Sequence, residues 1–273
     1  MKHRILKLLG LAGLVLATSV TLAACGNSSS KQLNTKKITI GVTAGPHEQI
    51  LDQVKKLAAK DGLKITVRSF TDYNTPNSAL SSGDIGANSY QTGQFLTQQE
   101  HDKNYKFDKA FKTIALPMGL YSKSIKNLKD LKNGDKIAVP NDPANETRAL
   151  ELFQKNGVIK LRKGAGEKAT KKDIVSNPKH LKVYELDASQ LPKQLNDITV
   201  AAINSNFALA NHIYLNTALA HEPLKHNVYA NYFVVQKGHK NDKVIKQVKK
   251  YYQSKTIKNY INKKFKGAVV AQW

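Results

Sequence analysis

Short apolar runs alternate with longer amphipathic segments along most of the chain. In residues 37–42, apolar and polar residues alternate, which is the period of a strand with one buried face. After Gly45 and Pro46 the apolar residues recur three and four positions apart, as in a helix, and Gly62 can end that helix. A second strand is expected over residues 64–70. The folded chain is therefore expected to begin with a β-α-β unit.

The same alternation continues to the C-terminus. We expect extended segments over residues 85–90, 136–140, 181–185, 199–204 and 229–235, with an apolar stretch over residues 111–120. We expect helices over residues 75–83, 94–104, 143–155, 242–253 and 256–265. Strands and helices that alternate in this way are typical of an α/β protein.

The expected elements form two α/β sets and a C-terminal remainder. We expect residues 229–273 to return to the first set and complete it. Lobe 1 would then contain residues 37–117 and 229–273, and lobe 2 would contain residues 118–228. Two segments would cross between the lobes. Proteins of this plan bind ligands in the cleft between lobes, where strand ends and helix N-termini converge.

The first 24 residues have the pattern of a signal peptide. Lys2, Arg4 and Lys7 precede an uncharged, largely apolar run that ends in small residues. That run is shorter than the roughly 20 apolar residues of a membrane-spanning helix, so a spanning helix is the less favoured alternative. Residues 25–36 are rich in Ser, Asn, Gly and Lys and are interpreted as a flexible tether.

Cys25 is the only cysteine of the chain, and it lies at the predicted cleavage boundary. The segment from Leu22 to Gly26 resembles the lipobox of bacterial lipoproteins, in which the cysteine is diacylated and becomes the new N-terminus. Two acyl chains anchor a protein stably to a membrane, whereas one does not. A small buried core residue is the alternative for a lone cysteine. We therefore expect lipidation at Cys25 and a location on the extracytoplasmic face of the cell membrane.

The chain is strongly basic, with a formal net charge of +23. Such an excess indicates an anionic neighbour, either nucleic acid or the lipid headgroups and polyanions of a cell envelope. Nucleic acid is disfavoured because the chain is expected to be secreted. Its lysines are also scattered, not clustered with interleaved aromatic residues. We interpret the charge as a solvated surface suited to the envelope.

The chain lacks the common catalytic and cofactor motifs, including those of serine hydrolases, zinc proteases and dinucleotide-binding folds. The segment from Gly164 to Thr170 looks like a phosphate loop, but Glu167 separates its glycine from its lysine, so we interpret it as a flexible loop. The histidines are dispersed, and none pairs with another ligand at helical spacing. We expect no enzymatic activity, no cofactor and no metal site.

Arg148 is a candidate ligand-binding residue because lysine outnumbers arginine 39 to 4 in this chain. Asp142 can cap the following helix and Pro143 can begin it, which leaves free N–H groups suited to an anion. From within that helix, the Arg148 guanidinium could clamp a carboxylate through two parallel hydrogen bonds. The alternative is a surface salt bridge to Glu146 or Glu151.

Several further motifs occur in one order over residues 37–273. They are Gly41-Val-Thr-Ala-Gly-Pro46, Phe70-Thr-Asp-Tyr-Asn-Thr-Pro-Asn77, Ala87-Asn-Ser-Tyr-Gln91, Tyr121-Ser-Lys-Ser-Ile-Lys126, Val139-Pro-Asn-Asp-Pro143 and Gly267-Ala-Val-Val-Ala-Gln-Trp273. Together they resemble the methionine-binding lipoproteins of bacterial ABC importers, the new lipoprotein A family. The resemblance implies an α/β fold with two lobes, the type II periplasmic-binding-protein architecture, with two crossing hinge segments.

The resemblance also implies roles for individual residues. It implies that Arg148 grips the carboxylate of the ligand, and that Asn204 and Asn231 bond its amino and carboxylate groups. It implies a side-chain pocket lined by the rings of Tyr73, Tyr90 and Phe95. Aromatic faces hold a polarizable thioether well. Ordinary core packing is the alternative for each aromatic residue taken alone.

The chain departs from the family after Tyr90 and Gln91. The family commonly has His, a variable residue, Pro and an aromatic residue there, whereas this chain has Thr92-Gly-Gln-Phe95. Thr92, also expected to contact the ligand, is smaller than His and carries no charge, and Gly93 loosens the backbone. We therefore expect a roomier pocket, which leaves open a different amino acid or a short methionine-containing peptide.

The resemblance implies a solute-binding lipoprotein whose lobes close on an L-amino acid, with methionine as the leading candidate. The receptor, a monomer, would deliver this ligand to a membrane permease driven by a separate ATPase. Its partners would be the amino acid, the permease with its ATPase, and the membrane through the lipid anchor, without nucleic acid. A basic envelope or adhesion protein without transport is the alternative class.

Overall fold

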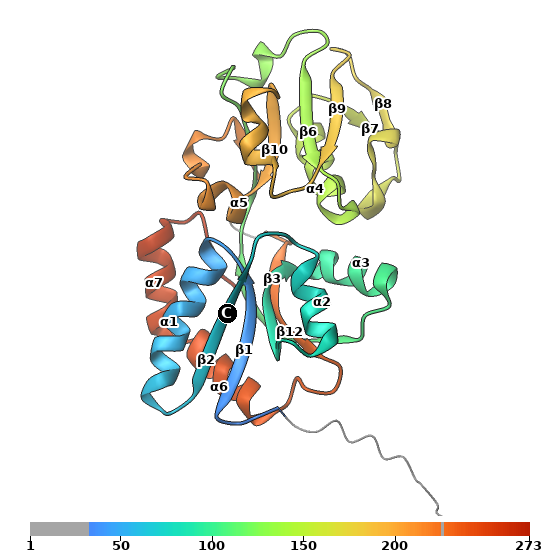
Figure 1. Cartoon of the computed structure of the whole chain (residues 1–273). Helices are drawn as coiled ribbons and strands as arrows, with labels where there is room; N and C mark the ends of the chain where they lie inside the picture. Colours follow the sequence, from blue (N-terminus) through green and yellow to red (C-terminus); the bar gives the residue numbers. More distant parts are fainter. Residues whose placement is uncertain (1–32, 225–226) are drawn as a thin grey trace, which may run out of the picture. The chain divides into compact units, whose positions relative to one another are not determined.

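The computed structural model describes residues 33–224 and 227–273 (Figure 1). The predicted signal peptide, the predicted lipidation at Cys25 and most of the predicted tether lie outside these residues. None of the helices in the described part of the chain is long and apolar enough to cross a bilayer.

A six-stranded sheet forms the core of one lobe, with the strand order β13-β4-β12-β3-β1-β2. Its strands are β1 (Lys37–Thr43), β2 (Lys64–Phe70), β3 (Ala87–Thr92), β4 (Phe107–Ala115), β12 (Ala230–Gln236) and β13 (Val270–Ala271). Strands β2 and β3 run parallel to β1, whereas β12 runs antiparallel to both β3 and β4. The C-terminal strands therefore lie in the same sheet as the N-terminal ones.

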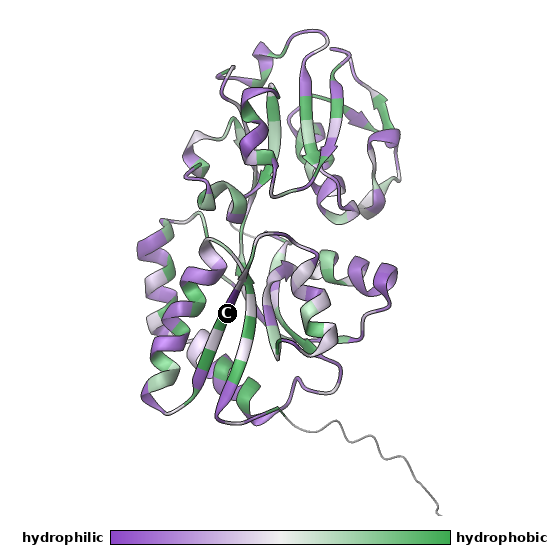
Figure 2. Cartoon of the chain, in the orientation of Figure 1, coloured by the Kyte–Doolittle hydropathy of each residue, from purple (hydrophilic) through white to green (hydrophobic). Residues whose placement is uncertain are grey.

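Helices cover this sheet. They are α1 (Pro46–Lys60), α2 (Thr75–Ser82), α3 (Gly93–Lys103), α6 (Lys243–Tyr252) and α7 (Lys255–Phe265). Helix α1 packs against α6 and α7, and its buried face places Ile50, Leu51 and Val54 in the same core cluster as Ile40 of β1. Figure 2 shows apolar residues along β1 and β2 and many polar residues along α1 and α7. Burial of these apolar faces stabilises the lobe.

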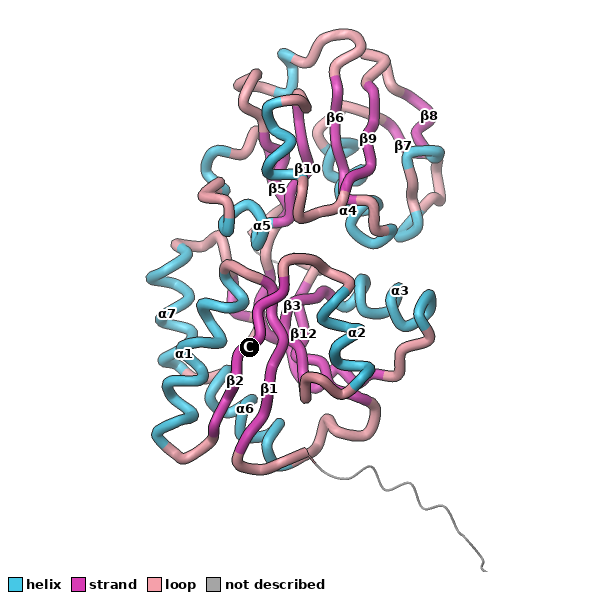
Figure 3. Tube along the Cα trace, viewed as in Figure 1, coloured by secondary structure: helices cyan, strands magenta, loops and turns pink. Residues whose placement is uncertain are grey.

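A second sheet of five strands, in the order β11-β5-β10-β6-β9, forms the core of the other lobe (Figure 3). Its strands are β5 (Met118–Tyr121), β6 (Lys136–Pro140), β9 (Lys182–Leu186), β10 (Val200–Asn204) and β11 (Ala220–His221), beside a small pair of β7 (Lys160–Leu161) and β8 (Ile174–Ser176). Its α-helices are α4 (Pro143–Lys155) and α5 (Ser205–Ala210). Short 3₁₀ helices span Leu128–Asp130, Gly166–Lys168, Lys171–Asp173, Leu191–Asn196 and Leu215–Thr217.

Two segments cross between the sheets. The first, Leu116 with Pro117, joins β4 to β5, and the second joins β11 to β12. The described chain is thus an α/β protein with two lobes and two crossing segments, which confirms the expected architecture. The exact residue ranges assigned to the lobes stay a prediction.

Most predicted elements occur within one or two residues of their expected positions, and β2 and β6 coincide with them. The apolar stretch over residues 111–120 is divided between β4 and β5. It is interrupted at Pro117, which has no N–H to donate to a ladder. The short elements α5, β7, β8, β11 and β13 were not predicted. The four strands have only two or three residues, too few to show an alternation, and α5 is shorter than two helical turns.

Candidate functional site

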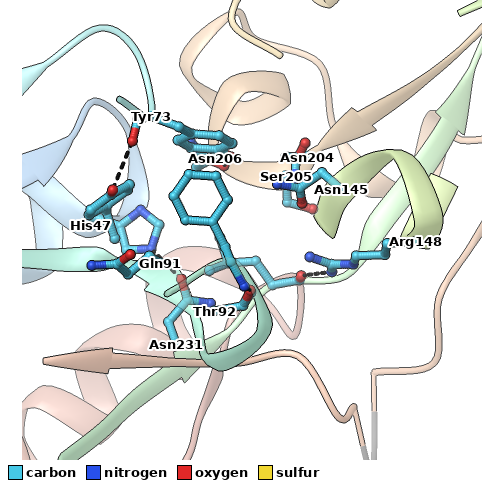
Figure 4. A pocket seen from close by; sticks show the side chains of 13 residues that line it. His47, Tyr73, Gln91, Thr92, Asn145, Arg148, Asn204, Ser205, Asn206 and Asn231 are labelled. Carbon is cyan, nitrogen blue, oxygen red and sulfur yellow. Dashed lines mark hydrogen bonds between the residues drawn. The ribbon is translucent and has the colours of Figure 1, made fainter. Parts of the chain in front are cut away.

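One cavity, with an empty volume of about 350 Å³, is lined by residues from both lobes (Figure 4). Its lining consists of His47, Tyr73, Tyr90, Gln91, Thr92, Phe95, Leu116, Asn145, Arg148, Asn204, Ser205, Asn206 and Asn231. All the residues predicted to bind ligand are therefore brought together in one place: Tyr73, Tyr90, Thr92, Phe95, Arg148, Asn204 and Asn231. Many of them follow the carboxyl ends of parallel strands, where α/β folds place their ligand sites.

One end of the cavity is formed by three aromatic rings. The ring of Tyr73 lies 5.9 Å from that of Tyr90 and 5.7 Å from that of Phe95, measured between centroids. The Tyr73 hydroxyl donates to Asn206 Oδ1 at 2.6 Å, and the Tyr90 hydroxyl donates to the Tyr73 carbonyl at 2.8 Å. Burial raises the pKa of both tyrosines, so both stay neutral. With their hydroxyls paired, the rings offer apolar faces to the cavity.

The turn from β3 into α3 positions the aromatic end. Thr92 ends β3, lies opposite Asn231 in β12, and caps α3 by accepting a hydrogen bond from the Phe95 N–H at 3.2 Å. A side chain at Gly93 would place its Cβ 3.1 Å from the Tyr232 ring. The glycine thus permits a close approach between α3 and β12. Thr92 both lines the cavity and holds the helix that carries Phe95.

Arg148, at the other end, is held by a buried ion pair. Its Nε donates to Glu222 Oε1 at 2.6 Å, and its Nη2 donates to Glu222 Oε2 at 2.5 Å and to the Leu116 carbonyl at 2.7 Å. The Tyr229 ring lies 4.1 Å from the guanidinium carbon, a cation–π contact. The alternative of a surface pair with Glu146 or Glu151 is wrong, because Arg148 is only 4% exposed and its carboxylate partner is 74 residues away.

Arg148 is charged at every physiological pH. Burial lowers the pKa of its guanidinium, but the Glu222 carboxylate and its hydrogen bond outweigh burial, and the net pKa lies above the ordinary value. The described residues provide no partner for Nη1. Because Arg148 lines the cavity, these two N–H groups are its remaining donors.

A chain of amide groups leads from the N-terminus of α4 to the cavity. Asp142 caps α4, as predicted, by accepting a hydrogen bond from the Asn145 N–H at 2.9 Å. Asn145 Nδ2 also donates to Asp142 Oδ1 at 3.0 Å, and Asn204 Nδ2 donates to Asn145 Oδ1 at 2.8 Å. Asn204 is 6% exposed, and its Oδ1 has no hydrogen-bond partner among the described residues. This buried acceptor is therefore available to a ligand.

A neutral histidine supports the wall near β12. His47 Nδ1 lies 3.0 Å from Thr43 Oγ1, and His47 Nε2 lies 3.3 Å from Asn231 Oδ1. Burial lowers the pKa of His47 to about 4, although the hydrogen bond to Asn231 acts to raise it. The ring is therefore neutral at pH 7. Arg148 is therefore the one charged side chain at neutral pH among the residues that line the cavity.

Several lining residues were not predicted: His47, Gln91, Leu116, Asn145, Ser205 and Asn206. Two of them had a usable signal, because His47 lies in the first turn of α1, the helix that follows β1, and Asn206 lies two residues beyond the predicted Asn204. Glu222 contacts Arg148 but does not line the cavity, and nothing in the neighbouring sequence indicated a role for it. Among the described residues no group of His, Cys, Asp and Glu could hold a metal ion.

The sequence matches the family model described as NlpA lipoprotein over residues 38–273. The chain belongs to the NlpA lipoprotein family. Two of its relatives in this family are the D-methionine-binding lipoproteins MetQ of Salmonella typhimurium and Escherichia coli K12. They are 40% and 38% identical to the chain, each over 93% of this chain and 94% of the relative. Outer membrane lipoprotein 3 of Mannheimia haemolytica is 37% identical over 98% of this chain and 100% of its own length.

Two solved structures have the same fold. A nutrient-binding protein from Burkholderia cenocepacia, bound to methionine, is 46% identical and superposes with a TM-score of 0.84. That match covers 86% of this chain and 100% of the other. The methionine-binding protein MetQ is 38% identical with a TM-score of 0.85, over 88% and 99% of the two chains. These matches confirm the periplasmic-binding-protein architecture and show that the NlpA lipoprotein chain is of a substrate-binding class.

Proposed function

We propose that the chain is the solute-binding lipoprotein of an ABC importer and that its ligand is methionine. The observation that carries this proposal is that the Arg148 guanidinium and the unpartnered acceptor Asn204 Oδ1 line the same cavity. A cation and a bare acceptor at one end, with three rings at the other, complement a carboxylate, an ammonium group and a thioether. The ligands that the relatives are named for, methionine and D-methionine, agree with this chemistry.

The carboxylate of the ligand would bind at Arg148. Two of the three guanidinium nitrogens are engaged by Glu222 and Leu116, so the contact would be made through Nη1. A charge-assisted hydrogen bond of this kind is roughly twice as strong as a neutral one. The fixed guanidinium also loses little freedom on binding, because the protein already holds it in place.

The ammonium group would donate to Asn204 Oδ1. Leaving a buried acceptor unpaired costs about 1–3 kcal/mol, and the ligand would remove that cost. Asn231 lies in the same lining and would complete the polar end with its amide, as the resemblance implies. A ligand without an ammonium group would leave the Asn204 acceptor unsatisfied.

The thioether would lie among the rings of Tyr73, Tyr90 and Phe95. Sulfur contacts aromatic rings favourably, with about 0.3–1.5 kcal/mol per contact. Thr92 would contact the ligand beside this end.

The proposal includes the setting of the receptor. Residues 37–117 and 229–273 would form one lobe and residues 118–228 the other, closing over the amino acid. The receptor would act as a monomer, held at the extracytoplasmic face of the membrane by lipid on Cys25, and would deliver methionine to a permease with a separate ATPase. Replacement Cys25→Ser should release the protein from membranes, and retention of that variant would contradict the anchor.

Thermal denaturation of the soluble chain from Gly26 onward tests the ligand, since residues from Gln32 to Trp273 form one compact unit. Protein purified through unfolding, to remove bound solute, is mixed with L-methionine, D-methionine, other amino acids and methionine dipeptides. A ligand at 100 times its dissociation constant should stabilise the fold by about 2.7 kcal/mol. Methioninamide, which lacks the carboxylate, is the matched control and should stabilise less. No shift with any amino acid would contradict the receptor function.

A further inference from the structure

We propose that Glu222 is a specificity-determining residue: as the fixed counter-charge of Arg148, it makes the cavity select zwitterionic amino acids over simple carboxylic acids. The inference rests on the proposed function, because it concerns the same cavity. Glu222 does not line the cavity and would act through Arg148, so it is a positioning residue.

The carboxylate of Glu222 is buried and held from several sides. It is 6% exposed, and Oε2 accepts hydrogen bonds from Arg148 Nη2 and from the Met118 N–H at 2.8 Å. Asn227 Nδ2 donates to the same oxygen at 3.4 Å, while Oε1 accepts from Arg148 Nε. These donors come from α4, from the start of β5 and from the second crossing segment. The fold therefore holds Glu222 through contacts from three parts of the chain.

The charge balance around the cavity follows from this pair. Arg148 is the one charged residue in the lining at neutral pH. The carboxylate of Glu222, which lies outside the lining, neutralises the positive charge of Arg148 through a direct ion pair. A zwitterion adds no net charge to this neutral pair. A carboxylic acid without an ammonium group would instead leave one uncompensated negative charge in a buried place, which is strongly unfavourable.

Glu222 is not the sole carboxylate near the polar end. Glu151 accepts a hydrogen bond from the hydroxyl of Tyr229, whose ring covers the Arg148 guanidinium, so the charge of Glu151 also opposes a lone carboxylate. Another is Asp142. It reaches the cavity only through the amides of Asn145 and Asn204, and it does not line the cavity. Its negative charge also favours an ammonium group at Asn204 and opposes a lone carboxylate. Asp142 therefore leaves the direction of the Glu222 effect unchanged.

The test compares methionine with its deaminated analogue, a methylthio-substituted butanoate, by titration calorimetry. In Glu222→Gln the Arg148 charge is no longer cancelled, so the ratio of analogue affinity to methionine affinity should rise roughly tenfold or more. Glu222→Asp keeps the charge, so its ratio should stay near that of the unchanged chain even if both affinities fall. Asp242→Asn removes a different buried carboxylate, one bonded to His239, and should leave the ratio unchanged.

Equal weakening of both ligands in Glu222→Gln would show a merely structural role and would overturn the inference. If the unchanged chain binds no amino acid, the proposed function fails instead, which is a separate result. The unchanged chain also gives a test that needs no variant. It should bind methionine more tightly than the deaminated analogue. Equal affinity for both ligands would overturn the inference.

Discussion

The two ends of the cavity are held by different forces. At the polar end, Arg148 and Asn204 are fixed by hydrogen bonds to Glu222, Leu116 and Asn145. At the aromatic end, the rings of Tyr73, Tyr90 and Phe95 pack against one another, and Tyr73 also packs against the ring of Phe207. The hydroxyls of the two tyrosines are paired to the protein.

This difference separates two tasks. Hydrogen bonds have a direction, so the polar end can recognise the carboxylate and ammonium groups that all amino acids share. Packing against rings is sensitive to shape and polarizability, so the aromatic end can distinguish one side chain from another. Substitutions at the polar end should therefore weaken every amino acid ligand, and substitutions at the aromatic end should change their ranking.

The largest effect is expected for Arg148→Ala. This change removes the cation that would bind the carboxylate and leaves Glu222 buried without its partner. We expect methionine affinity to fall by about 2–5 kcal/mol, measured by titration calorimetry. Arg162→Ala is the matched control, because Arg162 is exposed, with its side chain 63% accessible and paired to Asp173. An unchanged affinity in Arg148→Ala would show that Arg148 does not bind the ligand.

Asn204→Ala should have the next largest effect on affinity. It removes the acceptor proposed for the ammonium group, and a hydrogen bond to a charged group contributes about 1.5–3 kcal/mol. The loss should be similar for L-amino acids with different side chains, as measured by competition binding. Asn156→Ala, which removes an amide bonded to the Leu152 carbonyl outside the cavity, is the control. A loss confined to methionine would contradict the division between the two ends.

Asp142→Asn tests whether the buried carboxylate of Asp142, near the polar end, lowers the free energy of unfolding. Burial, opposed by hydrogen bonds from Asn145, raises the pKa of Asp142 from 3.8 to about 6. Its stabilising contribution is therefore present below pH 3.8 and is lost as the pH rises to about 6. Since Asn also caps helices well, the variant should be more stable than the unchanged chain by about 1 kcal/mol above pH 6 and equal to it near pH 3.

The measurement is the free energy of unfolding as a function of pH. Asp173→Asn is the control with the opposite sign. Backbone hydrogen bonding to Thr170, followed by the contact with Arg162, lowers the pKa of Asp173, so its stabilising contribution is lost as the pH falls. A stability difference in Asp142→Asn that grows towards acid would refute the assignment.

Phe95→Ala should have the smallest effect and the most selective one. Loss of one ring from the aromatic end should reduce methionine affinity by about 1 kcal/mol, the size of an aromatic contact. Affinity for alanine, which does not reach the rings, should stay the same. Phe70→Ala removes a buried ring from the neighbouring core and should lower stability without changing the ranking. A uniform loss in Phe95→Ala would show that the ring only supports the fold.

The sequence predicted more of the fold than of the site. Elements such as β2 and α4 carry their own period, cap and stop, so local patterns were sufficient to place them. The composition of the chain also identified Arg148 as unusual, because arginine is rare here. The resemblance to a known family then assigned Asn204 and the rings of Tyr73, Tyr90 and Phe95 to one ligand site. Their spacing along the chain gave no sign that they lie together.

The local sequence pattern could not predict that Glu222 pairs with Arg148, or that Asn204 Oδ1 has no partner among the described residues. Glu222 meets Arg148 only because β11 and β12 bring the second crossing segment beside α4. Similarly, Thr92 was noticed as a departure from the family, whereas its hydrogen bond to Phe95 shows that it also caps a helix.

By itself, the sequence determined the α/β elements, their order and the residues expected around one ligand, because hydrophobic period and capping act over a few neighbouring residues. Only the tertiary structure decided which groups in the cavity remain free. Hydrogen bonds and ion pairs act over a few ångströms in space, and Arg148 meets Glu222 across 74 residues of chain. Among the residues that the structure describes, these pairings leave Arg148 Nη1 and Asn204 Oδ1 without a partner, and both would be available to a ligand.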